Sequence, residues 1–244
     1  MSTNDHLTRK LEHFTQLSPA EKDALEKLMG ERVRRIAARE DLLREGSKAE
    51  YVCLILSGWA CRYRTLEDGR RQITAFLVPG DLSDPDESIL RAMDHSIGAL
   101  TRVTCADISR EAIERVTGAH PRLSKALRWE RLVTAAIQRE WTVSLGQRSA
   151  FERVAHLLCE LFLRLHAVGL VEANRCELPP TQAELAEATG LSAVQVNRTL
   201  QELRRQGLIL LRGRELAIPN LKALQSAAQF NPNYLHRDHE GLAA

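Results

Sequence analysis

The chain has 244 residues, with 34 lysines and arginines against 32 acidic residues, so its net charge is only +2. Its 44% hydrophobic and 27% charged residues provide material for a core and for a polar surface. No apolar run is long enough to span a bilayer, and the polar start of the chain lacks the apolar stretch of a signal peptide. We therefore expect a cytoplasmic protein with no membrane partner, of one large or two ordinary domains.

The cysteines are scattered, at Cys53, Cys61, Cys105, Cys159 and Cys176. No two of them have the CxxC spacing that is typical of zinc and iron–sulfur sites. In a cytosolic protein we expect reduced, mostly buried thiols and no bound metal. A redox-sensing thiol is the alternative.

The first predicted element is a helix from Leu11 to Glu31. Within it, Ser18 is a capping residue, Pro19 suits the first helical position, and Glu21 completes a capping box.

From Arg32 onward the hydrophobic pattern shortens to that of strands. The strand-like runs lie at Val33 and Ile36, Leu42-Leu43, Tyr51 to Leu56, Ala60 to Tyr63, Ile73 to Val78 and Val103 to Ile108. The turn sequences between them are Glu45-Gly46, Ser57-Gly58, Asp68-Gly69 and Pro79-Gly80-Asp81. Asp68-Gly69 between two runs predicts a hairpin, and the whole pattern predicts a small β-sandwich or barrel.

A long helical stretch is predicted from Glu111 to about Leu145, with Pro121 suited to a helix start. Its apolar stripe consists of Leu123, Leu127, Val133, Ile137 and Trp141. Such a stripe packs either on the helix's own barrel or on a second copy of the helix. We favour the dimer, because a long linker helix has limited barrel surface to cover. An amphipathic helix from Ala150 to His166 and a loop from Gly169 to Pro180 follow.

The segment from Thr181 to Ile209 predicts a helix-turn-helix. Thr181 with Glu184, and Ser192 with Gln195, form two capping boxes that each begin a helix. Gly190 ends the first helix, where a positive φ is needed. These are two short helices around a tight turn.

The second of these helices has an apolar and a polar face. Val196, Leu200 and Leu203 point inward, and the polar side chains opposite them suit the major groove of DNA. Arginine can bond guanine, and glutamine or asparagine can bond adenine. The candidate base-reading residues are Gln195, Asn197, Arg198 and Gln201. Gln195 has the alternative role of completing its capping box.

A short basic hairpin follows, with Arg212-Gly213-Arg214 between Leu208 to Leu211 and Leu216 to Ile218. It predicts a wing that contacts phosphates, and it extends a basic patch that begins at Ser192. The alternative is an ordinary solvated helix face. The candidate phosphate-binding residues are Thr181, Gln182, Ser192, Arg205, Arg212 and Arg214.

The arrangement from Ser18 to about Leu221 resembles the Crp/Fnr family of bacterial transcription regulators. The matching segments are Glu45-Gly46, Ser57-Gly58, Asp68-Gly69, Pro79-Gly80-Asp81 and Thr181 to Ile209. The resemblance implies an N-terminal β-roll, similar to cyclic-nucleotide-binding domains, that senses a signal. It further implies a long helix that dimerises the protein and a C-terminal winged helix that binds a palindromic DNA site.

The resemblance also locates a ligand pocket, whose candidate residues are Leu82, Glu87, Ser88, His95, Ser96, Gln138 and Arg139. Cyclic-nucleotide binders of the family hold the phosphate with an Arg-Ser or Arg-Thr pair, where this chain has His95-Ser96. Where cyclic-AMP receptors place Thr-Ser against the adenine, this chain has Gln138-Arg139. A nearby acidic cluster would repel a phosphate; it consists of Asp81, Asp84, Asp86 and Glu87. We therefore expect a small-molecule effector other than cyclic AMP.

Two further departures from the family concern cofactors and DNA sequence. The family's oxygen sensors bind an iron–sulfur cluster through cysteines near the N-terminus, and this chain has none before Cys53. We expect no cofactor; haem on His95 or Cys105 is the alternative. Val194 stands where well-known members have a glutamate. The cytosine contact that such a glutamate makes should therefore be absent, and the half-site should differ from the familiar ones.

The sequence thus predicts an α+β fold with a cyclic-nucleotide-binding-like β-roll, a long dimerisation helix and a C-terminal winged helix-turn-helix. The expected divisions are 1–110, 111–146, 147–222 and a tail at 223–244. We expect a homodimeric, DNA-binding transcription regulator whose partners include double-stranded DNA and RNA polymerase, and no enzyme, since no catalytic motif is found. The alternatives are a ligand-binding module that controls a partner protein without DNA, and a regulator whose sensor no longer binds a ligand.

Overall fold

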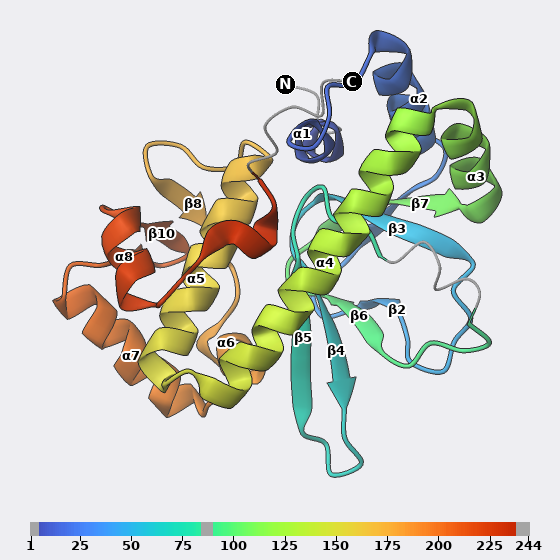
Figure 1. Ribbon diagram of the computed structural model, residues 1–244. Coiled ribbons are helices and arrows are strands. Elements are labelled where there is room, and N and C mark those ends of the chain that lie inside the picture. The colour runs from blue at the N-terminus through green and yellow to red at the C-terminus, as the bar shows by residue number, and fades with distance from the viewer. Residues whose placement is uncertain (1–4, 84–89, 238–244) are drawn as a thin grey trace.

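The computed structural model describes residues 5–83 and 90–237. A β-roll and a helical lobe lie on opposite sides of the long helix α4 (Pro121–Gln147), as Figure 1 shows. The expected α+β architecture is confirmed. In the described part of the chain, no helix is both long enough and apolar enough to cross a membrane.

The N-terminal segment forms two helices, α1 (His6–Glu12) and α2 (Pro19–Gly30), where one from Leu11 to Glu31 was expected. The chain breaks between them because a residue that precedes a proline disfavours the helical conformation. The expected capping box is present: Ser18 accepts from the backbone of Glu21, whose side chain accepts from the backbone of Ser18.

The β-roll consists of two antiparallel sheets, with strand orders β1-β7-β3 and β2-β6-β4-β5. Its strands are β1 (Val33–Ile36), β2 (Asp41–Leu43), β3 (Tyr51–Ser57), β4 (Ala60–Thr65), β5 (Arg71–Leu77), β6 (Ser96–Ala99) and β7 (Val103–Ser109). The predicted hairpin joins β4 to β5, with Gly69 at φ +84°. Strand β6 was not predicted, because Ile97 is its only large apolar residue.

The helical stretch expected from Glu111 to Leu145 is two helices, α3 (Arg110–Ala119) and α4. His120 leaves the helical conformation between them, and Pro121 begins α4. The expectation that the stripe of α4 faces a second copy is wrong. Leu123, Val133 and Ile137 are buried within their own chain. Helix α4 contacts not only the roll, through β5, but also α1, α3, α5 and the C-terminal segment.

The helical lobe follows α4. Its elements are α5 (Ala150–Ala167), β8 (Arg175–Glu177), α6 (Gln182–Thr189), α7 (Ala193–Arg205), β9 (Leu210–Arg212), β10 (Glu215–Ala217), α8 (Leu221–Ala227) and η2 (Pro232–Leu235). Strand β8 lies in the expected loop and pairs with β10. The segment expected as a tail from residue 223 contains most of α8 and all of η2, which contact α5 and α4 respectively.

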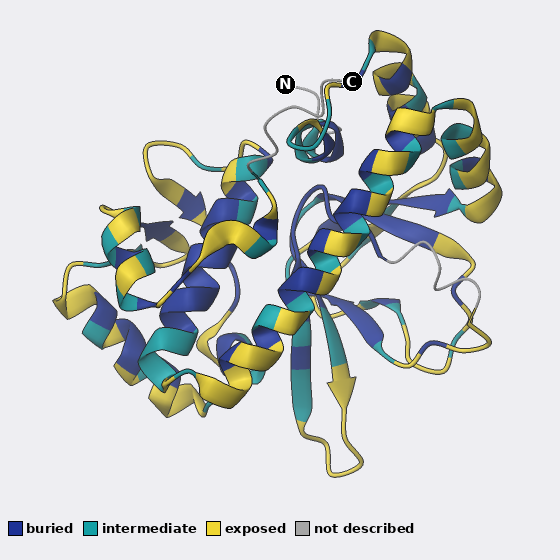
Figure 2. Ribbon diagram, in the orientation of Figure 1, coloured by how far each residue is buried: buried dark blue, intermediate teal, exposed yellow. Residues whose placement is uncertain are grey.

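The two sides share one apolar core. It runs from Trp59 and Phe76 in the β-roll through Trp141 on α4 into α5 and the helical lobe. The Phe76 and Trp141 rings meet edge to face, with 6.0 Å between centroids. Figure 2 shows buried residues on the facing surfaces of both sides and exposed residues along the outer side of α4. Helix α6 also contacts β5, and Arg71 Nη2 lies 2.7 Å from Glu187 Oε2.

Candidate nucleic-acid interface and ligand cavity

The helix-turn-helix forms as predicted from its sequence. Both capping boxes are present, at Thr181 with Glu184 and at Ser192 with Gln195. Gly190 ends α6 in the left-handed conformation, with φ 64°. An added Cβ at this position would lie 3.1 Å from Leu145 Cδ2, so the turn also packs closely on the end of α4.

Arg153 on α5 fixes the corner between α4 and the motif. Its Nη1 donates to the carbonyl oxygen of Thr189 at 2.7 Å, at the end of α6. Its Nη2 donates to the carbonyl oxygens of Leu145 and Arg148, at 3.0 Å each. One guanidinium therefore joins α4, the α4–α5 corner and α6.

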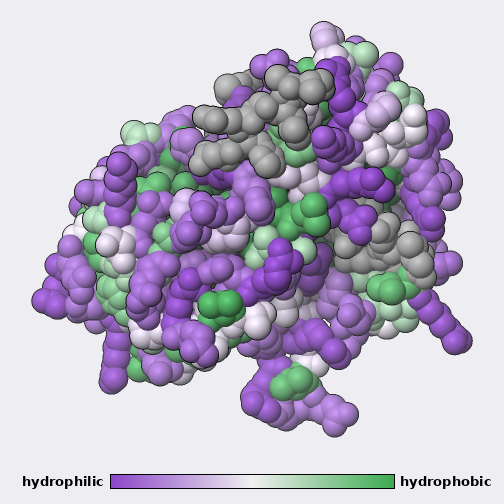
Figure 3. Space-filling view, viewed as in Figure 1, coloured by the Kyte–Doolittle hydropathy of each residue, from purple (hydrophilic) through white to green (hydrophobic). Residues whose placement is uncertain are grey.

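The second helix of the motif, α7, separates its apolar and polar faces as expected. Val196, Leu200 and Leu203 are buried, whereas Arg198 and Gln201 are exposed. The lobe that carries α7 has a mostly hydrophilic surface in Figure 3. The exposed face is therefore open to a polar, charged partner.

Arg198 makes no hydrogen bond or ion pair with any residue in the described ranges 5–83 and 90–237. Glu202, the nearest acidic candidate on its helix, is held instead by Arg205 Nη2 at 2.7 Å and Gln206 Nε2 at 2.6 Å. These hydrogen bonds, that of Arg205 first, lower the pKa of Glu202 to about 2. The Arg198 guanidinium is thus available to a ligand.

The amides of the motif form a chain of hydrogen bonds. Asn197 Nδ2 donates to Gln182 Oε1 at 3.0 Å, and Gln201 Nε2 donates to Asn197 Oδ1 at 2.9 Å. Gln195 uses its side-chain oxygen in the capping box of Ser192. The chain fixes the orientation of three polar side chains that span α6 and α7.

The candidate phosphate-binding residues lie at the exposed rim of this face. Thr181 and Ser192 are at the starts of α6 and α7, where free backbone N–H groups suit an anion. Arg205 is paired with Glu202. Arg212 and Arg214 are exposed on either side of Gly213 at the β9–β10 turn, as expected for a wing.

A cavity of about 60 Å³ lies between β5, α1, α4, α5 and the C-terminal segment. Of the candidate pocket residues, the structure brings Leu82 and Gln138 to this cavity, and Gln138 Nε2 donates to the Thr74 carbonyl at 2.8 Å. Arg139 is exposed and does not line it. Glu87 and Ser88 lie outside the described residues.

The other two candidates, His95 and Ser96, do not line the cavity. His95 Nδ1 lies 2.7 Å from Asp94 Oδ1, and Ser96 Oγ accepts from the Glu45 backbone at 2.9 Å. Sequence reasoning missed the charged residues that do line it, because they come from distant elements. These are Lys10, Arg62, Arg164 and Arg237; a fifth charged residue, Asp81, was expected near the ligand as part of the acidic cluster and lines the cavity as well.

Asp81 is a structural ion-pair residue in this fold. Burial disfavours its charge, but Lys10 and Arg164 outweigh this effect and hold its pKa below the usual value. Its carboxylate lies 2.7 Å from Lys10 Nζ and 2.6 Å from Arg164 Nη2. Asp81 is thus neutralised by its partners and cannot repel a phosphate as the sequence suggested; the other members of that acidic cluster lie outside the described residues.

Two protein-family models match parts of this chain. Residues 33–120 match the model of the cyclic nucleotide-binding domain, and residues 152–227 match that of the Crp-like helix-turn-helix domain. The chain is 30% identical over 185 residues to the transcriptional activator protein FnrL of Cereibacter sphaeroides, covering 74% of this chain and 73% of the relative. It is 30% identical over 177 residues to the nitrogen fixation regulation protein FixK of Azorhizobium caulinodans, covering 72% and 70%.

Among solved structures, FixK2 from Bradyrhizobium japonicum superposes with a TM-score of 0.70 at 26% identity, covering 80% of this chain and 96% of that chain. The c-di-GMP responsive regulator CLP of Xanthomonas campestris shares the fold, with a TM-score of 0.63 at 18% identity, covering 83% and 100%. The relatives that match are regulators of transcription and not enzymes. The chain belongs to the Crp/Fnr family of bacterial transcription regulators and carries its DNA-binding helix-turn-helix.

Proposed function

We propose that the protein is a cytoplasmic, dimeric regulator that reads a palindromic promoter site with α7 and contacts RNA polymerase there. The observation that carries the proposal is the exposed face of α7, on which Arg198 has no ion-pair partner among the described residues. Two copies related by a two-fold axis would present two such helices to half-sites about 34 Å apart.

Base reading is assigned to the outer face of α7. Arg198 would bond a guanine, and the Asn197–Gln201 pair would bond an adenine. Val194 is 61% exposed at the first turn of the helix. An exposed valine there suits the methyl group of a thymine, so the half-site would differ from sites read by a glutamate at this position.

The remaining polar residues would position the motif on the DNA backbone. The starts of α6 and α7 at Thr181, Gln182 and Ser192, and the wing arginines Arg212 and Arg214, would contact phosphates. Arg205 would contact a phosphate only if its ion pair with Glu202 were broken.

The dimer would form through the outer face of α4. Its exposed residues recur at alternating spacings of four and three, which is the repeat of a two-helix seam; they are Arg128, Leu132, Ala135, Arg139 and Thr142. Leu132 is 66% exposed, and Val143 is 48% exposed beside this row. The row is mixed, with Arg128 and Arg139 in it, so Leu132 and Val143 would supply the main apolar contact with a second copy.

The effector would bind in the cavity against α4. The cavity is small compared with the roughly 300–1,000 Å³ of pockets for drug-sized ligands. It is lined by aliphatic and aromatic side chains together with Lys10, Arg62 and Arg164. Because Lys10 and Arg164 are already paired with Asp81, Glu130 and Glu160, this lining suits a small, mostly apolar molecule, and the cavity is too small for a cyclic nucleotide without rearrangement.

Selection of bound sequences from a random DNA pool tests the proposal. The expected result is an inverted repeat whose half-site centres lie about one helical turn apart. Recovery of no sequence preference, by a protein that is folded and dimeric, would instead favour a module that controls a partner protein without DNA.

A further inference from the structure

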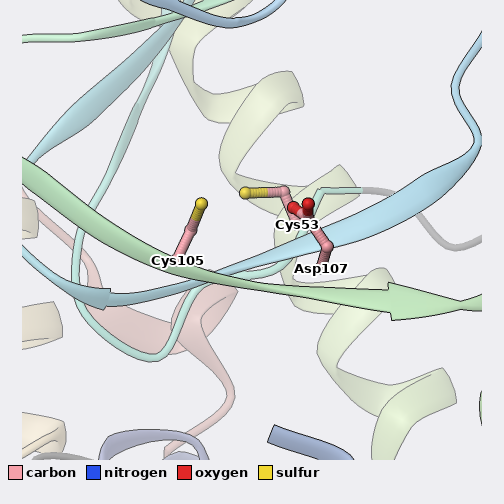
Figure 4. A group of neighbouring side chains, drawn as sticks. All are labelled: Cys53, Cys105 and Asp107. Atoms are coloured by element: carbon pink, nitrogen blue, oxygen red, sulfur yellow. The ribbon is translucent and has the colours of Figure 1, made fainter. Parts of the chain in front are cut away.

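Two cysteines that are far apart in the sequence meet inside the β-roll. Cys53 lies on β3 opposite Asp107 on β7, and Cys105 lies two residues before Asp107 on the same face of β7. Figure 4 shows the two sulfur atoms facing one another beside the carboxylate. Both Sγ atoms and a carboxylate oxygen lie within 4.8 Å of one another, and all three residues are buried.

The surroundings of this Cys53–Cys105–Asp107 cluster are suited to ionised donors. Arg34 on β1 is the register partner of Cys105 and donates through Nη2 to Asp107 Oδ1 at 2.9 Å. Arg34 Nε lies 2.5 Å from Asp107 Oδ2, and Arg32 Nε lies 3.4 Å from the same atom, so two cations lie beside the cluster.

We propose that Cys53, Cys105 and Asp107 bind a thiophilic divalent cation of the zinc class. In a tetrahedral site, bonds of about 2.3 Å to sulfur and about 2.0–2.2 Å to oxygen place the donors about 3.5–3.8 Å apart. The donor atoms lie within 4.8 Å of one another, so they would have to move closer by up to about 1.3 Å to reach that geometry. The three donors come from two adjacent strands of one sheet, which holds them rigidly.

The charges of the site balance when the cation is bound. Two thiolates and one carboxylate carry three negative charges, and the dication with Arg34 carries three positive ones; Arg32, which also pairs with Asp107, is 52% exposed to solvent. Buried charges are tolerated when they are paired in this way. Binding displaces the thiol protons, which leave to solvent, so affinity rises with pH.

The fourth coordination position would be approached from the side of Cys53 and Asp107, since Cys105 does not line the neighbouring cavity. A cavity of about 200 Å³ is lined by Cys53 and Asp107 together with Arg32, Arg34 and Tyr51. Three protein ligands with one open position are typical of sites where the metal also holds water or a small ligand. Since β7 ends at Ser109, which caps α3, the cation would tie β3 to the strand that leads into α3 and α4.

Cobalt(II) is the probe, because thiolate ligation gives it an intense near-ultraviolet charge-transfer band. The reduced, full-length protein is titrated with Co²⁺ without oxygen and then with Zn²⁺. We expect one cobalt per chain, the charge-transfer band, and its loss when Zn²⁺ displaces the cobalt. Cys53→Ser and Cys105→Ser should each abolish the band, and Asp107→Asn should weaken binding at least about tenfold.

Cys176→Ser is the matched control, because Cys176 is a buried thiol on β8 in the other lobe. It should bind cobalt like the wild type. Zinc should raise the thermal midpoint of the wild type and of Cys176→Ser, but not that of Cys53→Ser. A wild type without the charge-transfer band, a disulfide in place of bound metal, or equal binding by Cys53→Ser would each overturn the proposal. The wild-type spectrum decides even if a variant does not fold.

Discussion

Arg164 on α5 and Asp81 in the turn after β5 form a buried ion pair across the two lobes, with 2.6 Å between Nη2 and Oδ2. Arg164 also lies 3.2 Å from Glu160, and Lys10 joins Asp81 to Glu130 on α4 at 2.7 and 2.6 Å. Burial raises the pKa of Glu160, against its bonds from Arg164, Trp141 and Tyr234. The helical lobe is thus held on the β-roll by charges that cannot be separated without exposing or neutralising them.

Replacing one charged side chain of this buried network should destabilise the protein. Arg164→Met leaves Asp81 and Glu160 with one cation fewer in a buried site, so the free energy of unfolding should fall by about 3–5 kcal/mol. Urea unfolding followed by fluorescence measures the change. Arg70→Ala, which breaks an exposed pair with Asp68, should cost about 0–1 kcal/mol. Equal effects of the two substitutions would show that the buried network is not stabilising.

The free energy of unfolding should fall in mild acid, because His156 takes up a proton more easily in the unfolded chain than in the folded one. Burial first, and then the charge of Arg148, lower the pKa of this histidine from 6.5 to about 3. Glu140 Oε1 lies 3.3 Å from the ring but also pairs with Arg148 at 2.6 Å, so its charge is already compensated. Between these two pKa values only the unfolded chain takes up the proton, so stability present above pH 6.5 is lost as the pH falls toward 3, by up to about 1.4 kcal/mol per pH unit.

His156→Phe tests this pH dependence, because phenylalanine keeps the ring contacts with Phe230 and Tyr234 but cannot be protonated. Unfolding measured from pH 4 to 7 should show a smaller slope for the variant by up to one proton. The same change at His120, which is half-buried between α3 and α4, serves as the control. An unchanged slope in His156→Phe would contradict the assignment.

Arg198 and Arg212 should affect DNA binding in different ways. Arg198→Ala should cost about 1–3 kcal/mol on the preferred site and relax the base preference at one position of each half-site. Arg212→Ala should weaken binding to all sequences alike and reduce the salt slope by about one unit for each phosphate that is no longer neutralised. Titrations on preferred and scrambled DNA at several salt concentrations separate the two. If Arg198→Ala weakens both DNAs equally, Arg198 does not read a base.

Leu132→Glu should dissociate the dimer. It places a negative charge on each of the two α4 helices where they meet in the proposed dimer. These like charges repel, so the dissociation constant of the dimer should rise at least about tenfold. Light scattering over a range of concentrations measures it. Leu66 is also exposed, at 51%, but lies in the β4–β5 hairpin, so Leu66→Glu should leave the dimer intact. A wild type that is monomeric with and without DNA would refute the proposed seam.

Cyclic AMP should not bind tightly. The cavity against α4 is small, and His95-Ser96 lies outside it rather than supplying a phosphate site there. Calorimetric titration should therefore show no complex in the micromolar range. A micromolar or tighter complex would mean that the cavity opens and that cations such as Arg62 or Lys10 hold the phosphate.

Features that depend on neighbouring residues could be predicted from the sequence. The capping boxes at Ser18, Thr181 and Ser192 and the turn at Gly69 are each set by a few adjacent side chains, and all are present. The apolar face of α7 was predictable for the same reason, since its period is that of one helix.

Features that depend on the fold could not be predicted in this way. A stripe on α4 shows that one face is buried, but not whether its own chain or a second copy covers it. The meeting of Cys53 with Cys105, and of Asp81 with Arg164, depends on strand register and on the packing of lobes. Residue spacing along the chain does not reveal register or lobe packing, so the basic residues that line the cavity were missed as well.

The three hydrogen bonds of Arg153 couple the C-terminal end of α4 to the helix-turn-helix. The 27 residues of α4 span about 40 Å at about 1.5 Å per residue. The Arg153 guanidinium links the end of α4 to the end of α6. A tilt of α4 would therefore move the helix-turn-helix with it. A tilt of about 5° moves the far end by about 3.5 Å, close to the ~3.4 Å rise of one base pair. In the proposed dimer, a small adjustment where the cavity meets α4 would therefore change the spacing between the two reading helices by about one base pair.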